Sequence, residues 1–372
     1  MEKSITVAEI NVSALLSNFD NIKKKISPVK IMPIVKANAY GHGIEVVSQE
    51  LDKRGADYFG VAYLNEAITL RRIGISKPIL MFVPVFESGI STAIENDLDM
   101  TVISLPYAKE ISEISKRLKK KGRIQIKVDT GMGRIGIDWQ EAPEIIVKIS
   151  KLPNLEIVGL FSQFASSDIK DKSFAKIQLE RFNNVIEKID KKNIKIPLKH
   201  MANSGAILDI EDSYLDIVRP GIMLYGYYPS RETTESIPIT PVMTLKSRII
   251  QKKRIKKGIS ISYDRSFISQ RDTTIVSIPI GYADGFRRML SNKGEILIHN
   301  KKYPIVGRVC MDFIMVDVGD DDTIKDGDEV IIFGRNENGS ISLLELCEKL
   351  DTIPYEILTQ ISPRVARIYV NR

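Results

Sequence analysis

Cysteine and histidine are scarce in this sequence of 372 residues, which limits the chemistry that the chain can support. The two cysteines, Cys310 and Cys347, are too few for a disulfide framework and lie outside any metal-binding spacing. The three histidines are scattered, so a histidine-based metal centre is not expected. We therefore predict no metal site, and the low cysteine content favours a reducing cytoplasm.

Long apolar runs are missing as well. No stretch of roughly 18 apolar residues is present, so we expect no membrane span. The first residues run directly into strand-like Ile5–Val7 and lack the basic and apolar segments of a secretion signal. With 43% hydrophobic and 27% charged residues, the chain has the composition of a globular protein long enough for two domains.

Positive charge is in excess, with a formal net charge of +7. Lysine runs such as Lys23–Lys25 and Lys119–Lys121 lack the interleaved aromatic residues of a nucleic-acid surface, and Asp320–Asp322 offsets them elsewhere. A solvated surface explains these lysines better than nucleic-acid binding does. We predict no nucleic-acid partner.

The first two-thirds of the chain alternates short apolar runs with segments of helical periodicity, such as Ala108–Lys120 and Phe174–Ile189. The eight predicted strands are Ile31–Ala37, Tyr58–Tyr63, Ile79–Val85, Met100–Ser104, Arg123–Asp129, Leu155–Phe164, Leu198–Asn203 and Asp216–Tyr225. Eight strand–helix units in about 225 residues predict an α/β fold, a (β/α)8 TIM-type barrel over residues 11–232. An open doubly wound sheet is the alternative.

The pattern changes after a linker near Ser230–Pro241 that is rich in Ser, Thr, Glu and Pro. The predicted strands beyond it are Val242–Ile250, Ile259–Tyr263, Thr274–Ile280, Glu295–Ile298, Tyr303–Val318 and Glu329–Phe333, and the predicted helices are Leu343–Leu350 and Tyr355–Ile361. We predict a mostly-β domain over residues 233–372, with an N-terminal strand in residues 1–10 packed against it.

Catalytic residues of such barrels lie at the C-terminal ends of the strands. The first predicted strand ends at Lys36, whose amine can form an imine with an aldehyde cofactor. Ser204 follows the seventh strand, and Arg219 and Gly221 lie in the eighth, where barrels commonly bind phosphate through a hydroxyl and backbone N–H groups. A lysine together with a phosphate cradle is the layout expected for pyridoxal phosphate.

The fifth predicted strand points Lys127 into the barrel, because its β-branched residues alternate onto the other face. Arg134 follows a few residues later. Two buried cations repel each other, so the pattern predicts an anionic group between them. A pair of Lys127 with Asp129 is the simpler alternative.

The sequence resembles the alanine racemases, fold-type III pyridoxal-phosphate enzymes, over essentially its whole length. Each supporting motif is moderately specific, but all of them occur in family order across both domains. They are Val35–Gly43, Asp129–Gly136, Val218–Gly221, Ser262–Tyr263, Pro279–Gly285, Gly307–Asp312 and Tyr355.

The resemblance implies an isomerase that interconverts L- and D-alanine by a two-base mechanism and supplies D-alanine for peptidoglycan. Lys36 would be joined to the cofactor and act as one base. Tyr263, from the partner subunit of a homodimer with shared active sites, would be the other. The implied cofactor-binding residues are Lys36, Tyr40, Arg134, Ser204, Arg219, Gly221, Ile222 and Tyr355. Arg134 and the Met311 backbone N–H would bind the substrate carboxylate.

The resemblance also assigns roles around these groups. Arg219 would face the pyridine nitrogen and, because arginine stays protonated, would leave that nitrogen neutral. A neutral ring is a weaker electron sink, which disfavours side reactions. Lys127 would be carbamylated, as it often is in the family, and would thereby supply the missing anion. Residues that surround the site without touching the reacting atoms are Gln163, His200, Tyr282 and Asp312.

The chain departs from the family at two positions. Gln163 replaces a usual histidine and can accept from Arg219 and donate to Tyr263, but it cannot carry a charge. Asp264 replaces a usual glycine, where it would oppose ionisation of the phenol, pair with Arg265 or reach a polar substrate side chain. A racemase for another or broader range of amino acids, such as serine or basic residues, is therefore the alternative. A non-catalytic cofactor carrier would lack the β domain, and a decarboxylase would carry a different cysteine motif.

Overall fold

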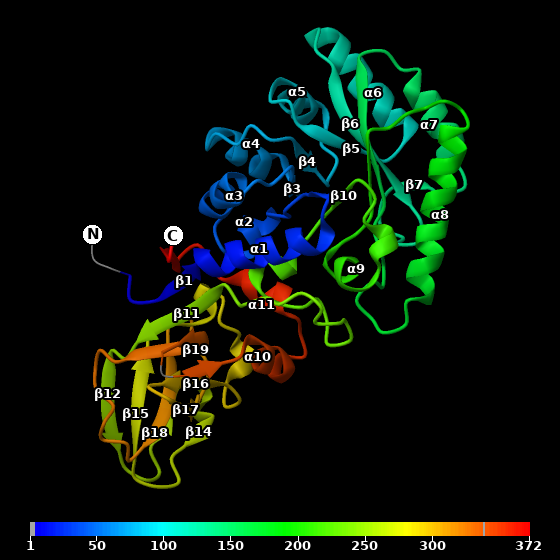
Figure 1. Ribbon diagram of the computed structural model, residues 1–372. Helices are drawn as coiled ribbons and strands as arrows, with labels where there is room; N and C mark the ends of the chain where they lie inside the picture. Colours follow the sequence, from blue (N-terminus) through cyan, green and yellow to red (C-terminus); the bar gives the residue numbers. More distant parts are fainter. Residues whose placement is uncertain (1–3, 338) are drawn as a thin grey trace. The chain divides into compact units, whose positions relative to one another are not determined.

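The computed structural model describes residues 4–337 and 339–372, which form two compact units. One unit, called here the barrel unit, comprises Ala14–Ala39 and Gly43–Thr240. The other, called here the β unit, comprises the segment ending at Ser13 together with Tyr40–His42 and Pro241–Arg372. Figure 1 follows the chain through both.

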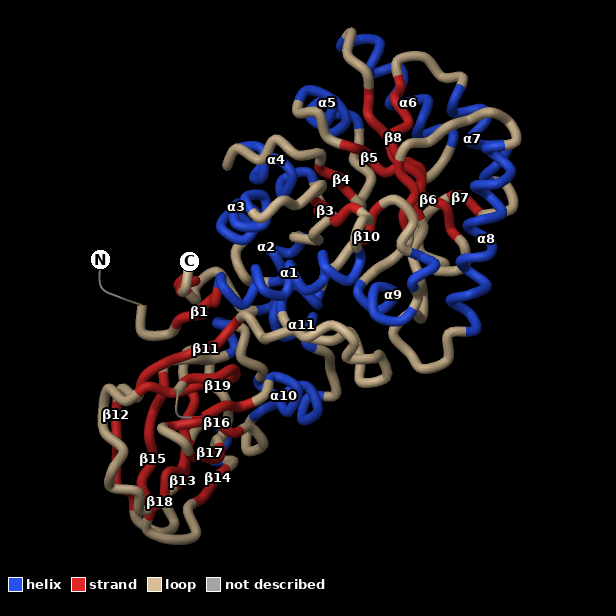
Figure 2. Tube along the Cα trace, in the orientation of Figure 1, coloured by secondary structure: helices blue, strands red, loops and turns tan. Residues whose placement is uncertain are grey.

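The barrel unit is built on eight short strands, which Figure 2 shows flanked by helices. They are β2 (Lys30–Ile31), β3 (Phe59–Val61), β4 (Ile79–Met81), β5 (Asp99–Val102), β6 (Gly122–Asp129), β8 (Leu155–Phe161), β9 (Leu198–His200) and β10 (Ile217–Val218). Strands β3-β4-β5-β6-β8-β9 form a parallel sheet, and β10 pairs in parallel with β2. A short strand, β7 (Ile137–Asp138), adds to β6.

Backbone hydrogen bonds close these strands into a ring. The Val35 N–H donates to the Gly60 carbonyl at 2.9 Å, which joins the continuation of β2 to β3. The Arg219 N–H donates to the Ala202 carbonyl at 2.9 Å, which joins the ends of β10 and β9. The predicted α/β barrel is therefore confirmed, and the open doubly wound sheet is wrong.

Helices cover the barrel because each has one apolar face. In α6 that face buries Ala108, Ile111 and Ile114. Ser104 caps this helix by accepting a hydrogen bond from the Tyr107 N–H, so α6 begins before the segment predicted from periodicity. The helices of this unit are α1 (Val12–Ile26), α3 (Ile44–Lys53), α4 (Leu64–Arg72), α5 (Glu87–Glu95), α6 (Leu105–Leu118), α7 (Ala142–Ser150), α8 (Ser173–Asp190) and α9 (Ser204–Asp209).

All the predicted barrel strands except Arg123–Asp129 extend past the C-terminal end of the observed strand, and the first and the last do so by the most residues. The first, Ile31–Ala37, gives way to α2 (Lys36–Tyr40), a left-handed turn. The last, Asp216–Tyr225, ends at Val218 and is followed by the 3-10 helix η2 (Ile222–Tyr225). Pro220 has no N–H to continue a ladder, which explains the second boundary. Both strand ends carry predicted site residues.

The β unit contains one large and two small sheets. The large sheet has the order β17-β16-β19-β11-β1-β21 with β20 on β19, and the small ones are β12-β15-β18 and β13-β14. The strands are β1 (Val7–Asn11), β11 (Met243–Arg248), β12 (Gln251–Ile255), β13 (Ser260–Ile261), β14 (Phe267–Ile268), β15 (Thr273–Ile278), β16 (Glu295–Ile298), β17 (Lys301–Pro304), β18 (Ile314–Gly319), β19 (Glu329–Asn336), β20 (Gly339–Ile341) and β21 (Ala366–Val370).

The N-terminal strand β1 lies between β11, antiparallel, and β21, parallel. The predicted strand Tyr303–Val318 is wrong as a single element, because β17 and β18 are separated by a loop that turns at Gly307 with a φ of 78°. Helices α10 (Leu343–Leu350) and α11 (Pro354–Gln360) complete the unit. None of the helices within residues 4–337 and 339–372 combines the length and apolarity that crossing a membrane requires.

Candidate active site

Lys36 begins a left-handed turn of non-glycine residues. Ala37, Asn38, Ala39 and Tyr40 all have φ between 52° and 55°, a region that costs such residues roughly 1–2 kcal/mol each. Asn38 offsets part of this cost, because its side-chain oxygen accepts from the Ile44 N–H at 2.9 Å. The surrounding structure thus maintains a strained backbone directly after the predicted catalytic amine.

Glu66 fixes the start of the same turn. Its Oε1 accepts from the Ala37 N–H at 2.6 Å, and its Oε2 accepts from the Ala62 N–H at 2.8 Å. Burial lowers the pKa of the Lys36 amine, the charge of Arg134 lowers it further, and Glu66 opposes both. A lowered pKa increases the neutral fraction of the amine, which is the nucleophilic form.

The predicted phosphate residues of the barrel unit lie together. Ser204 and Gly221 are buried, and the Gly221 N–H donates to Ser204 Oγ at 3.0 Å. Ser204 begins α9 and Ile222 begins η2, so both stand where backbone N–H groups are available to an anion. Asn203 stabilises this corner by accepting from the Ala206 N–H at 3.1 Å. The group has the donors that a phosphate requires.

Arg219 is buried beside this corner and is held by several acceptors. Its Nη1 donates to His200 Nδ1 at 2.6 Å, and its Nη2 donates to the Ser162 carbonyl at 2.8 Å and to Gln163 Oε1 at 2.9 Å. The last contact is the acceptor role that the sequence predicts for Gln163. Burial lowers the pKa of Arg219 to about 9, so the guanidinium remains charged at neutral pH.

Lys127 is buried in the barrel, as the strand alternation predicts. Its Nζ donates to the Val128 carbonyl at 3.0 Å. Burial lowers the pKa of Lys127 to about 7, and the positive charges of Arg219 and Arg134 add to this effect. A large share of this amine is therefore neutral at physiological pH.

Two expectations about the surroundings of Lys127 need correction. Arg134 is exposed, so it is not a second buried cation. It follows Gly133, whose φ is 68°, in the loop that connects β6 to β7. The alternative partner Asp129 is used elsewhere, since its carboxylate accepts from the backbone N–H groups of Gly131 and Met132, each at 2.9 Å.

In the β unit, Tyr40 and Tyr355 are neighbours, with ring centroids 6.0 Å apart. Burial raises the pKa of the Tyr40 phenol well above its usual range, so it stays a hydrogen-bond donor. Gly41 allows this packing, because a Cβ there would lie 2.0 Å from the Leu358 carbonyl oxygen. Arg367 Nε donates to the Gly41 carbonyl at 2.9 Å.

Met311 lies in a loop that is fixed by its backbone. The Tyr282 N–H donates to the Cys310 carbonyl at 3.0 Å, and the Ala283 N–H donates to the Met311 carbonyl at 3.1 Å. Asp312 accepts from Arg364 Nη2 at 2.7 Å. The Tyr282 side chain is exposed, so within this unit it points to solvent.

Tyr263 is the most exposed of the predicted catalytic groups, with 70% of its surface accessible. It opens the 3-10 turn η3 (Tyr263–Arg265), in which Asp264 has a φ of 59°. Asp264 pairs with Arg308, whose Nε lies 3.2 Å from Oδ2, and not with Arg265, whose Nε donates to Ser260 Oγ. Of the partners considered for Asp264, Arg265 is therefore wrong.

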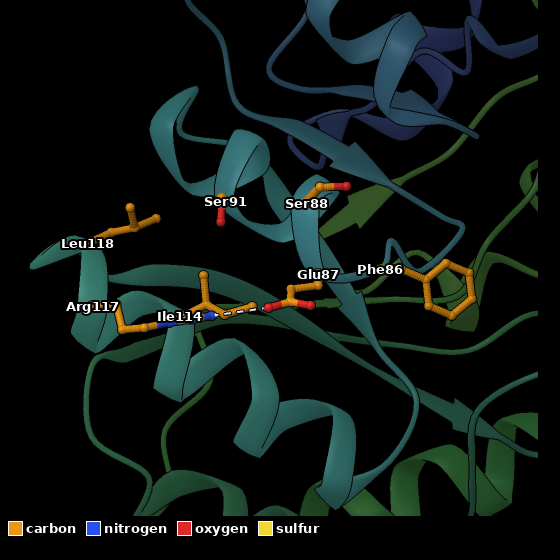
Figure 3. Close-up of a pocket in the computed structure, with 7 residues that line it drawn as sticks. All are labelled: Phe86, Glu87, Ser88, Ser91, Ile114, Arg117 and Leu118. Atoms are coloured by element: carbon orange, nitrogen blue, oxygen red, sulfur yellow. Dashed lines mark ion pairs between the residues drawn. The ribbon is translucent and has the colours of Figure 1, made fainter.

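One pocket contains predicted site residues, and a second pocket lies apart from them. In the β unit, a pocket is lined by Tyr263, Ser262, Cys310 and Phe313, among others. In the barrel unit, Figure 3 shows a pocket between α5 and α6, where Glu87 pairs with Arg117 at 3.7 Å. Phe86, Ser88, Ser91, Ile114 and Leu118 complete its lining, so it contains none of the predicted site residues.

Sequence reasoning missed Glu66 and the buried polar residues beyond His200. These are Gln125, Asp99 and Tyr58, which connect to His200 through side-chain hydrogen bonds. The alternation of side chains along the fifth predicted strand puts Gln125 on the same inward face as Lys127, and this pattern could have identified it. Asp99 stands at the start of a strand, and nothing in its sequence context distinguishes it from a surface carboxylate.

Comparison with known proteins matches both parts of the chain to family models. Residues 10–229 match "Alanine racemase, N-terminal domain" and residues 242–369 match "Alanine racemase, C-terminal domain". Alanine racemase 2 of Caldanaerobacter subterraneus subsp. tengcongensis is 46% identical over 371 residues, which cover 99% of this chain and 95% of that protein.

Solved structures agree. The alanine racemase of Clostridium difficile 630 is 39% identical with a TM-score of 0.96, over 100% of this chain and 97% of that one. The alanine racemase of Bartonella henselae, solved with covalently bound pyridoxal phosphate, is 31% identical with a TM-score of 0.89, over 99% of this chain and 100% of that one.

Proposed function

This chain belongs to the alanine racemase family, and we propose that it interconverts L-alanine and D-alanine with pyridoxal phosphate as its cofactor. The observation that carries the proposal is the donor set of the barrel unit. A half-buried amine of lowered pKa (Lys36), a buried charged guanidinium (Arg219) and a buried hydroxyl beside a glycine N–H (Ser204 and Gly221) suit the aldehyde, the ring nitrogen and the phosphate.

Each residue then has a defined task. Ser204 and the backbone of Gly221 and Ile222 would hold the phosphate. Arg219 would donate to the ring nitrogen of the bound cofactor without giving up its proton. When bound, pyridoxal phosphate supplies an electron sink that makes the proton on the substrate Cα removable.

Proton transfer at the substrate Cα needs a base on each face, because racemisation removes a proton from one face and returns it to the other. We assign Lys36 to one face and Tyr263 to the other. Arg134 and the Met311 N–H orient the carboxylate, which keeps the Cα–H bond pointing at a base.

A homodimer is part of this proposal. The exposed side chain of Tyr263 lines a pocket together with the exposed apolar residues Ile250, Ile259 and Phe313, and Met311 of the same unit is exposed as well. Exposed apolar patches commonly mark an interface. A second copy of the chain that covers this surface would receive Tyr263 and Met311 into its own site.

Alanine is favoured over basic amino acids by the Asp264–Arg308 pair. A carboxylate that is already paired with arginine does not attract a cationic substrate side chain. We also propose that the D-alanine formed enters peptidoglycan. A cytoplasmic location fits the free thiols of Cys310 and Cys347, since disulfides are rare in that compartment.

The test is a racemisation assay on the purified protein. L-alanine, D-alanine and a panel including serine, lysine and arginine are each incubated with the cofactor-loaded enzyme, and the enantiomers are separated by chiral chromatography. Formation of D-alanine from L-alanine supports the proposal. Turnover of another amino acid with alanine left unchanged would refute alanine as the substrate, and absence of turnover with every substrate would refute the activity.

A further inference from the structure

A chain of buried side chains crosses the interior of the barrel from Arg219. Arg219 Nη1 meets His200 Nδ1 at 2.6 Å, His200 Nε2 meets Gln125 Oε1 at 2.7 Å, and Gln125 Nε2 meets Asp99 Oδ2 at 2.9 Å. Tyr58 donates from its hydroxyl to the same Asp99 oxygen. His200, Gln125 and Asp99 are fully buried, so this chain is isolated from solvent.

The direction of every hydrogen bond in this chain follows from its two ends. Arg219 can only donate, so His200 Nδ1 must accept and carry no proton. His200 is neutral, because burial and the charges of Arg219 and Lys127 hold its pKa well below its usual range. Its proton therefore lies on Nε2 and is donated to Gln125 Oε1.

The Asp99 end of this chain of hydrogen bonds gives the same donor-to-acceptor directions independently. Asp99 Oδ1 accepts from Arg123 Nε at 2.8 Å, and a carboxylate paired in this way is an acceptor only. The Gln125 amide must then turn its NH2 group toward Asp99 and its oxygen toward His200. A buried cation and a buried anion are thus joined by two dipoles that point the same way, which makes each hydrogen bond stronger.

Gly159 leaves room in the barrel for the Gln125 side chain. Gly159 of β8 pairs with Gln125 of β6, and a Cβ at Gly159 would lie 2.5 Å from Gln125 Oε1. Any larger residue would push the amide out of line with His200. Gly159 does not have a positive φ, so its backbone conformation does not require glycine. The lack of space for a Cβ beside Gln125 explains the glycine.

We propose that Asp99 is a positioning residue for Arg219, acting through Gln125 and His200 to hold the guanidinium in one orientation. The inference rests on the proposed function, because it concerns the arginine assigned to the ring nitrogen of the cofactor. Asp99 touches neither cofactor nor substrate. Its effect is to fix the tautomer of His200 and hence the direction in which Arg219 presents its remaining donors.

Asp99→Asn tests this polarity. Arg123 will hold the amide oxygen of the introduced asparagine, so the NH2 group of that asparagine faces the Gln125 NH2 group and two donors oppose each other. Gln125 must then flip or withdraw, and His200 loses the acceptor on Nε2. We expect kcat for alanine to fall on the order of tenfold, the lower end of the loss seen when hydrogen-bond partners of metal-binding histidines are removed, with little change in KM.

The double variant Asp99→Asn with Gln125→Glu restores an acceptor for the Nε2–H of His200. The introduced glutamate accepts from His200 with one oxygen and from the NH2 group of the introduced asparagine with the other, while Arg123 keeps its acceptor. Tyr58→Phe is the matched control, because it removes the hydrogen bonds of the Tyr58 hydroxyl with Asp99 and with Gln125 Nε2 without reversing the donor direction between Asp99 and Gln125. The double variant should regain most of the lost kcat, and Tyr58→Phe should stay within about twofold of wild type.

The decisive readout is the ring of His200 in the holoenzyme labelled with 15N-histidine. The chain has three histidines, and His200→Asn identifies the resonances of His200. A single Nε2–H tautomer in wild type, in Tyr58→Phe and in the double variant, together with a mixed or altered state in Asp99→Asn, supports the proposal. This readout needs no turnover, so it separates a failure of this inference from a failure of the proposed racemase activity.

An unchanged tautomer of His200 and an unchanged kcat in Asp99→Asn would overturn the proposal. Equal losses of kcat in Asp99→Asn and Tyr58→Phe would do the same. So would a folded double variant that does not regain the kcat lost in Asp99→Asn. Should Asp99→Asn not fold, Gly159→Ala replaces it, because the added methyl displaces Gln125 and leaves every polar group in place. A folded Gly159→Ala protein with the wild-type His200 ring would equally rule the proposal out.

Discussion

The Nζ of Lys127 lies 5.4 Å from the centroid of the Phe161 ring, and both side chains are buried. The same ring stacks on His200 at 5.0 Å and lies 5.7 Å from the guanidinium carbon of Arg219. Lys127 and Arg219 thus lie near the same aromatic ring, and the positive charge of Arg219 lowers the pKa of Lys127. This arrangement favours a Lys127 that is not a cation.

Carbamylation of Lys127 is the first prediction. A neutral amine reacts with carbon dioxide, and the carbamate formed carries a negative charge that attracts Arg219. We expect intact-protein mass spectrometry under mild conditions at pH 8 in bicarbonate to show the added mass of one carbon dioxide, located at Lys127 by a density map. The matched control is Lys127→Met, which should lack the addition. An unmodified Lys127 in bicarbonate-saturated crystals would contradict the prediction.

The pKa of Lys127 also predicts how stability depends on pH. The folded pKa is about 7 and the usual value is 10.5, so between these values the unfolded chain binds a proton that the folded chain does not. Unfolding free energy therefore rises with pH across this window. Urea denaturation in buffer free of carbon dioxide, from pH 7 to pH 9, should show this rise in wild type and a flatter profile in Lys127→Met. Parallel profiles would mean that Lys127 does not titrate in this range.

Much of the fold was predictable, because a short apolar run indicates a buried strand even when the strands that pair with it are unknown. The left-handed turn after Lys36 was not, since no glycine marks Ala37–Tyr40 and only the surrounding structure imposes those angles. Alternation predicted that Lys127 points into the barrel, but periodicity gives the face of a strand and not the partner across the ring. The contact of Gln125 with His200, 75 residues away in the sequence, depends on ring closure.

Removal of the amine of Lys36 is expected to abolish covalent attachment of the cofactor. Lys36→Ala leaves the phosphate residues in place, so cofactor still binds, but its visible absorption band should resemble that of the free aldehyde and racemisation should cease. Absorbance spectra and borohydride trapping followed by mass spectrometry measure this. Lys30→Ala, which changes an exposed lysine of β2, is the control and should behave as wild type. Trapping of cofactor on another lysine in the wild-type protein would show that Lys36 is misassigned.

Tyr263→Phe is expected to keep the attached cofactor and to lose turnover in at least one direction, by about 100-fold or more for a general base. Exchange of the Cα proton with deuterated water should persist from one alanine enantiomer and disappear from the other. Tyr303→Phe, in the same unit and paired with Asp321 by its hydroxyl, controls for the loss of a phenol. Equal exchange from both enantiomers in Tyr263→Phe would exclude this tyrosine as the second base.

Asp264→Gly restores the residue usual in the family and is expected to leave stability almost unchanged. Glycine relieves the left-handed conformation at a φ of 59°, which costs an ordinary residue roughly 1–2 kcal/mol and aspartate less. The variant also loses the pair with Arg308, and partly exposed pairs contribute about 0–1 kcal/mol. The two effects oppose each other.

Because the Asp264 carboxylate is occupied by Arg308, relative turnover of alanine, serine and lysine should stay the same in this variant. Asp264→Asn separates the contributions, since asparagine tolerates the left-handed region but carries no charge. A large shift in preference toward or away from lysine in both variants would show that Asp264 selects the substrate after all.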